Sequence, residues 1–212
     1  MNRWPRTLDL TRWAALWHRL SAQGDGLAVF TRLAAAYAEP TRAYHTVEHI
    51  EDCLRLLDAG RVLARRPDEV ETAIWFHDAL YVAARTDNEE RSAELARASL
   101  READVASEVA ERIGALVLET RHATTPHDPD AALLCDIDLS ILGRSPEEFD
   151  LFERRIRQEY AMVPEPMYRR GRSEILRGFL HRAAIFQTAW FQQRYEKSAR
   201  ANLERMLATL AG

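Results

Sequence analysis

The chain has 212 residues, 47% hydrophobic and 29% charged, a composition that suits a sizeable buried core and excludes a disordered tail. Its 29 basic and 33 acidic residues give a net charge of −4, so no excess of positive charge is available for a nucleic-acid backbone or an anionic bilayer. We therefore expect neither nucleic acid nor membrane as a partner.

The two cysteines and the hydropathy pattern bear on the compartment. Cys53 and Cys135 lack the spacing of a zinc knuckle or of a secreted disulfide framework. No stretch of about eighteen uncharged apolar residues occurs, and the N-terminal segment has no continuous apolar region of the signal-peptide kind. These features predict a cytoplasmic protein.

The sequence predicts an all-α fold, because apolar residues recur with the 3.6-residue period of a helix and strict two-residue alternation is almost absent. Glycines, prolines and capping residues divide the chain into segments. The predicted helices cover residues 10–20, 27–38, 46–60, 67–81, 87–101, 104–122, 131–142, 145–160 and 168–210. We expect a bundle of about eight to ten helices with a metal site at its centre.

The domain organisation follows from the absence of any linker, repeat or low-complexity tract. We expect one domain over residues 1–212, with N-terminal helices 8–38 packing on the core, the chemically distinctive motifs at 44–143 and C-terminal helices at 145–211. The segment 67–81 is apolar nearly all round, which is typical of a helix at the centre of a bundle. The clearest local signal is the helix start at Ser145, Pro146 and Glu148, which combines a capping box with a proline at the first helical position.

Several polar residues stand where a core is expected. His45 and His49 are four residues apart at a predicted helix start, a spacing that can bring two side chains to one place. His77 and Asp78 are adjacent at the end of the apolar segment, about 100° apart on a helix, and can still converge on one ion.

Asp136 and Asp138 lie in the apolar run 131–142, where an unpaired buried carboxylate would cost several kcal/mol, on the order of its desolvation penalty. Two positions apart on a helix means about 200° of rotation, so only one of them can point at a given centre. The other needs a different partner.

Two imidazoles and two carboxylates suit a divalent first-row metal ion with open positions for water and substrate. Such an ion lowers the pKa of a bound water towards neutrality and polarises a phosphoryl oxygen. The donor set fits Mn, Fe, Co, Ni or Zn, whereas Mg is less natural because of the imidazoles.

The same residues resemble a known family, the HD superfamily of metal-dependent phosphohydrolases, which is named for its His-Asp pair. The resemblance runs from about Arg42 to the C-terminus and rests on an ordered series of motifs rather than on one dipeptide. Further segments look like a small subgroup of predicted HD phosphohydrolases. The matching segments are YHTVEH at 44–49, FHD at 76–78, CDIDLSILG at 135–143, and, for the subgroup, NEERSA at 88–93, ETRH at 119–122 and IRQEY at 156–160.

The resemblance implies a set of metal ligands. They are His49, His77, Asp78 and one of Asp136 or Asp138. A similarity to cyclic-nucleotide phosphodiesterases of the same superfamily favours Asp138 as the fourth ligand. It also gives His45 the role of a general acid that protonates the leaving group.

The chain departs from those phosphodiesterases after the His-Asp pair, where they have further histidines for a second metal. Residues 79–82 are Ala, Leu, Tyr and Val here, so we expect one metal ion per chain. Glu89 is expected to hold the attacking water or a ligand. Arg42, Asn88 and His122 are expected to contact the substrate, with Arg42 and His122 as candidates for gripping phosphate.

Three functions remain open at this stage. The favoured one is hydrolysis of a small phosphate ester, a nucleotide in particular, by metal-activated water. The second is an HD-fold di-iron oxygenase, for which His122 and His127 would have to supply additional ligands. The third is a non-catalytic regulatory module that binds a nucleotide. A homodimer is also left open, because late apolar residues could pack within the domain or against a second copy: Phe179, Phe186, Trp190 and Phe191.

Overall fold

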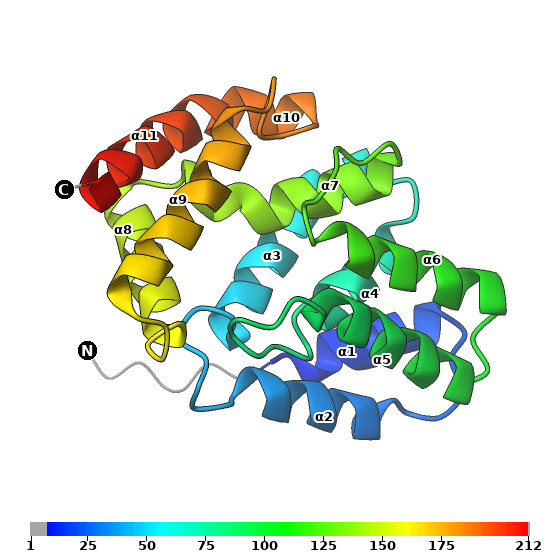
Figure 1. Cartoon of the computed structure of the whole chain (residues 1–212). Helices are drawn as coiled ribbons and strands as arrows, with labels where there is room; N and C mark the ends of the chain where they lie inside the picture. The colour runs from blue at the N-terminus through cyan, green and yellow to red at the C-terminus, as the bar shows by residue number, and fades with distance from the viewer. Residues whose placement is uncertain (1–7, 212) are drawn as a thin grey trace, which may run out of the picture. The chain divides into compact units, whose positions relative to one another are not determined.

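The computed structural model describes residues 8–211 (Figure 1). All regular elements in this range are helices, which confirms the all-α prediction. None of these helices is long and apolar enough to cross a membrane. Residues 1–7 and 212, which the predicted domain includes, lie outside the described range.

Contacts between residues divide the chain into two compact units, Met1–Leu134 and Cys135–Gly212. The boundary falls inside helix α7 (Pro129–Asp138), which begins in the first unit and ends in the second. The single domain over residues 1–212 stays a prediction.

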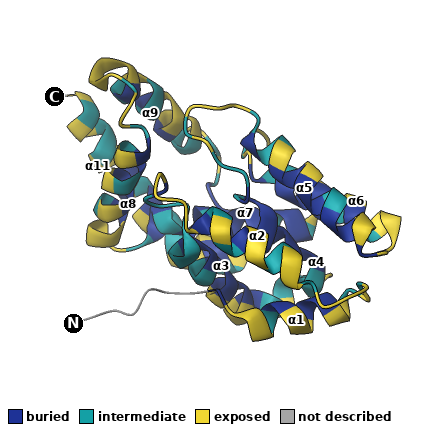
Figure 2. Cartoon of the chain, turned by 90° about the horizontal axis from the view of Figure 1, so that it is seen from below, coloured by how far each residue is buried: buried dark blue, intermediate teal, exposed yellow. Residues whose placement is uncertain are grey.

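The first unit is built around helix α4. Contacts join α4 to α1, α3, α5 and α6, and α5 and α6 lie side by side (Figure 1). Every residue of α4 from Glu69 to Phe76 is buried, while α5 and α6 keep exposed outer faces (Figure 2). The central position expected for this segment is confirmed. The helices are α1 (Leu10–Arg19), α2 (Leu27–Tyr37), α3 (Val47–Gly60), α4 (Pro67–Phe76), α5 (Asn88–Glu102) and α6 (Ser107–Glu119).

A cluster of ion pairs ties the outer elements of this unit to α4. The carboxylate of Glu71 is almost completely buried and accepts hydrogen bonds from Arg12 Nε at 2.7 Å and Arg19 Nη2 at 3.1 Å. A third comes from Arg61 Nη1 at 2.9 Å. Since breaking a buried pair leaves an uncompensated charge, this cluster fixes α1 and the 3-10 turn Arg61–Leu63 on α4.

Helix α4 ends at Phe76, so the predicted continuation to Tyr81 is wrong. The backbone beyond it finds partners outside the helix. Two carbonyl oxygens, those of Asp78 and Ala79, accept hydrogen bonds from Arg42, and the N–H of Leu80 donates to the Ser92 hydroxyl. These tertiary hydrogen bonds take the place of helical ones. Because the apolar pattern of the sequence does not report them, it predicted a longer helix than the one observed.

The second unit contains α8, α9 and α11, with α11 packed on α9 and on the 3-10 segment Leu139–Gly143. The predicted capping box is confirmed: Ser145 Oγ accepts from the Glu148 N–H at 3.3 Å, and Glu148 accepts from the Ser145 N–H at 3.2 Å. Phe186 and Phe191 are fully buried. The helical elements are α8 (Pro146–Glu159), α9 (Glu165–Leu180), α10 (Ala189–Phe191), a π-helical segment (Gln192–Glu196) and α11 (Lys197–Ala211).

The predicted helix over residues 168–210 is wrong, because the chain leaves the helix at Leu180 and resumes only at Ala189. Backbone N–H groups of Ile185 and Phe186 donate to the carboxylate of Glu196. The next two N–H groups donate to Asp136. Carboxylates distant in sequence thus satisfy donors that a helix would otherwise have used.

Candidate metal site

The candidate metal site in the first unit comes from two helix ends. Thr46 is the N-cap residue of α3, which places His49 in the first turn of that helix. His77 and Asp78 directly follow the last residue of α4. His45 precedes α3 rather than lying on it, and its ring is 6.1 Å from that of His49 at an interplanar angle of 81°.

Three ligand-type atoms converge in this unit. His49 Nε2 lies 3.1 Å from His77 Nε2, and Asp78 Oδ2 lies 3.0 Å from His77 Nε2 and 3.5 Å from His49 Nε2. Both imidazoles are buried, with 5% and 2% of the residue exposed for His49 and His77. The structure thus brings together three of the residues that the sequence analysis names as metal ligands, and their role as ligands stays a prediction.

The hydrogen bonding of His77 fixes which of its ring nitrogens faces the cluster. His77 Nδ1 lies 2.9 Å from the carbonyl oxygen of Ile74, and because a carbonyl only accepts, Nδ1 carries a hydrogen. In a neutral ring the lone pair of Nε2 would then face the Asp78 carboxylate. A proton shared among these three groups, or a cation between them, would relieve the repulsion between the lone pairs. This geometry suits a metal ligand, since such histidines usually donate their other N–H to a carbonyl or carboxylate.

The charge state of Asp78 also suits a ligand. Burial raises the pKa of its carboxyl, but the positive charges of His77 and His45, with the hydrogen bond from His77, hold that pKa well below its usual range. The carboxylate is therefore ionised at neutral pH. An ionised carboxylate beside two imidazole nitrogens has the chemistry of a metal-ligand set.

The two aspartates of α7 belong to the second unit. Asp136 is fully buried and accepts three hydrogen bonds of 2.7 Å, from the N–H groups of Gln187 and Thr188 and from the Thr188 hydroxyl. Burial raises the pKa of Asp136 to about 6, against the lowering effect of these donors. These three donors are the separate partners that one of the two aspartates was expected to need.

Asp138 is the last residue of α7 and is half-buried. Its carboxylate has the ligand chemistry to join His49 and His77. Its role as the fourth ligand stays a prediction.

The side chain of Arg42 is engaged with acceptors of the protein and is not open to a phosphate. Its side chain is 1% exposed and its guanidinium donates to four acceptors. These are Glu39 Oε2 at 3.0 Å and the carbonyl oxygens of His45, Asp78 and Ala79 at 3.3, 2.6 and 3.1 Å. The structure therefore uses Arg42 to join the segment before α3 to the segment after α4.

Asn88 is also engaged with the protein. Its amide accepts from the N–H of Val82 at 3.0 Å and donates to the carbonyl oxygen of Val82 at 3.1 Å. Glu89, the next residue on α5, is half-buried, and its pKa is raised by burial and by the negative charge of Asp78. Of the two, only Glu89 interacts electrostatically with the candidate metal site.

The remaining histidines named from the sequence lie beyond α6. His122 is half-buried and has a positive φ of 54°, whereas His127 is exposed. The group of described residues that could hold a metal ion includes neither of them.

Sequence reasoning missed two neighbours of the site. Cys53 is buried one turn after His49, with Sγ 3.8 Å from both nitrogens of that ring, a contact that the four-residue spacing could have indicated. Tyr81 is the second neighbour, with its ring centroid 4.1 Å from that of His45.

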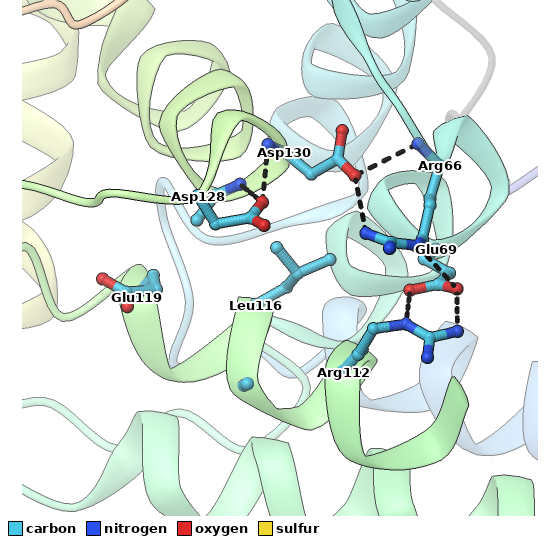
Figure 3. A pocket seen from close by; sticks show the side chains of 9 residues that line it. Arg66, Glu69, Arg112, Leu116, Glu119, Asp128 and Asp130 are labelled. Atoms are coloured by element: carbon cyan, nitrogen blue, oxygen red, sulfur yellow. Dashed lines mark hydrogen bonds and ion pairs between the residues drawn. The ribbon is translucent and has the colours of Figure 1, made fainter. Parts of the chain in front are cut away.

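A separate pocket of about 150 Å³ in the first unit shares no lining residue with the site (Figure 3). Its charged groups are largely paired with one another. Arg112 donates two hydrogen bonds to Glu69, and Asp130 accepts from the N–H groups of Arg65 and Arg66. These pairs join segments of the first unit that are distant in sequence.

Comparison of the chain with protein-family models, with curated proteins and with solved structures finds no match.

Proposed function

We propose that this chain is a metal-dependent phosphohydrolase that cleaves a small phosphate ester, of the nucleotide class, with a metal-activated water. The observation that carries the proposal is the convergence of His49 Nε2, His77 Nε2 and Asp78 Oδ2 within 3.5 Å of one another. The resemblance of the motifs to HD phosphohydrolases supplies the class of reaction. The geometry supports the proposed donor set.

The proposed ligands are His49, His77, Asp78 and Asp138, for one divalent ion per chain. Asp136 is the weaker candidate for the fourth ligand because three donors of its own unit already surround it. Imidazole nitrogens favour Mn, Fe, Co, Ni or Zn over Mg.

When bound, the ion supplies a water of lowered pKa and polarises a phosphoryl oxygen. The protein residues supply orientation and protons. Ile74 orients His77 through the hydrogen bond to Nδ1, and Asp78 contributes a carboxylate that is ionised at neutral pH. Glu89 is proposed to accept a hydrogen bond from the attacking water, and His45 to protonate the leaving oxygen.

The test is metal analysis by mass spectrometry on protein purified without chelator, combined with phosphate release. The panel contains nucleoside mono-, di- and triphosphates, a cyclic nucleotide and simple phosphomonoesters, each with added Mn, Co, Ni or Mg. We expect about one ion per chain and metal-dependent release from at least one compound.

Other outcomes would contradict the proposal. Two irons per chain without phosphate release would favour an oxygenase. Nucleotide binding without turnover under any metal would favour a regulatory module. A suitable control is His127→Ala, which removes an exposed histidine outside the proposed ligand set.

A further inference from the structure

Residues 78–82, shortly after the end of α4, are held largely by side chains from other segments. Arg42 donates to the carbonyl oxygens of Asp78 and Ala79. Ser92 Oγ accepts from the Leu80 N–H at 3.0 Å and donates to the Leu80 carbonyl oxygen at 3.4 Å. Asn88 pairs with both backbone polar groups of Val82. The residue between these two pairs is Tyr81.

The spacing of the two pairs has a simple geometric basis. Asn88 and Ser92 are four residues apart on α5, which corresponds to about 6 Å along a helix. Alternate residues of an extended chain are about 6.6 Å apart. One face of α5 can therefore bind the backbone groups of Leu80 and Val82 at the same time, which holds the chain on both sides of Tyr81.

The ring of Tyr81 lies against the imidazole of His45. The two ring centroids are 4.1 Å apart and the planes are tilted by 30°. Tyr44 meets the same imidazole edge-on, with a centroid distance of 5.1 Å and an interplanar angle of 83°. Arg42 interacts with both residues: its guanidinium carbon lies 5.6 Å from the centroid of the Tyr81 ring, and its guanidinium donates a hydrogen bond to the carbonyl oxygen of His45.

We propose that Tyr81 is a positioning residue for His45, and that Asn88 and Ser92 hold Tyr81 in place for this purpose. The torsion that turns an imidazole has broad minima, so packing against the ring narrows the range of directions in which its nitrogens can point. Stacking on Tyr81 restricts this rotation and keeps one orientation of His45 beside the metal site. The consequence for turnover rests on the proposed function, whereas the restriction of the ring does not.

The first experiment measures the His45 ring directly. Proton and nitrogen NMR signals of its imidazole are assigned by their loss in His45→Gln and compared in Tyr81→Leu, Tyr81→Phe and Val82→Ala. Val82→Ala is the matched control, since that side chain is 51% exposed and adjacent to Tyr81. We expect Tyr81→Leu to move the ring protons downfield, because the shielding of the stacked ring is lost, while Tyr81→Phe and Val82→Ala leave them nearly unchanged. Unchanged signals in Tyr81→Leu would overturn the proposal.

The second experiment measures turnover with a substrate found in the phosphate-release panel. We expect Tyr81→Leu to lower kcat about tenfold or more, with KM little changed and metal content retained, since general acid catalysis contributes about 10²–10⁴-fold. In combination with His45→Gln, Tyr81→Leu should then have almost no further effect, because residues that act through one another are not additive.

Effects on kcat that multiply would show that Tyr81 does not act through His45 and would overturn the positioning role. If the wild-type chain releases no phosphate from any compound, the proposed function fails instead. The NMR comparison then still decides whether the Tyr81 ring packs on the His45 imidazole.

Discussion

His77 Nδ1 lies 2.9 Å from the backbone carbonyl oxygen of Ile74, three residues earlier on α4. This carbonyl is one of the last four of the helix, which lack a partner within the helix itself. The end of α4 thus provides the acceptor that fixes the tautomer of the neutral His77 ring, with Nε2 towards His49 and Asp78. The termination of α4 and the orientation of the His77 ring therefore have the same local cause.

Asp78→Asn should lower metal affinity by at least about tenfold, because it removes one ionised ligand oxygen, and even residues that only support metal ligands cost about 10–100-fold. The measurement is bound metal after dialysis against graded concentrations of a chelator, with His127→Ala as the control. Full occupancy of Asp78→Asn under these conditions would exclude Asp78 as a ligand.

His45→Gln should retain the metal and lower kcat by about 10²-fold or more, because a general acid contributes to proton transfer and not to metal binding. Metal content and phosphate release are measured on the same preparation. Loss of both together would place His45 among the ligands.

Arg42→Lys should destabilise the chain by about 1–3 kcal/mol, because a lysine cannot reproduce the forked donation to the carbonyl oxygens of His45, Asp78 and Ala79. We also expect weaker metal binding, since the backbone of Asp78 loses a support. Urea unfolding and metal titration measure the two effects, with the exposed Arg85→Lys as control. Unchanged metal affinity would confine Arg42 to fold stability.

Asp136→Asn should lower the free energy of unfolding by about 2–4 kcal/mol, because an amide cannot accept all three hydrogen bonds and hydrogen bonds to charged groups contribute about 1.5–3 kcal/mol each. Urea unfolding measures this change, and Glu204→Gln, an exposed acid of the same unit, should change it by less than about 0.5 kcal/mol. Metal content should stay at the wild-type level in the folded variant. Loss of metal without loss of stability would favour Asp136 over Asp138 as the fourth ligand.

Glu89→Gln should become more stable relative to the wild type as the pH rises. Burial and the charge of Asp78 raise the pKa of Glu89 in the folded chain, so the folded state retains this proton at pH values where the unfolded state has lost it. The stabilisation by protonated Glu89 is fully present below the pKa that Glu89 has in the unfolded chain. It is lost as the pH rises through the higher pKa that Glu89 has in the folded chain. Unfolding free energies of both proteins between acid and neutral pH test this, and a constant difference would contradict it.

Local sequence patterns, each spanning a few residues, determined the fold class and several helix starts of this protein. The 3.6-residue period determined the all-α class, Thr46 marked the start of α3, and the sequence around Ser145 determined the capped start of α8. The convergence of His49 with the His77-Asp78 pair was also predictable, because the motifs resemble those of a family with a known ligand set.

Only the tertiary structure decided where two apolar segments stop being helical and which polar groups serve the fold. α4 ends at Phe76 because Arg42 and Ser92 form hydrogen bonds with the backbone after it. The helix predicted over residues 168–210 is interrupted because the carboxylates of Glu196 and Asp136 accept hydrogen bonds from the N–H groups of residues 185–188. Such partners are distant in sequence, and hydropathy carries no information about them. The same physical reason explains why Arg42 and Asn88, which look available for a substrate in the sequence, are engaged by backbone groups in the folded chain.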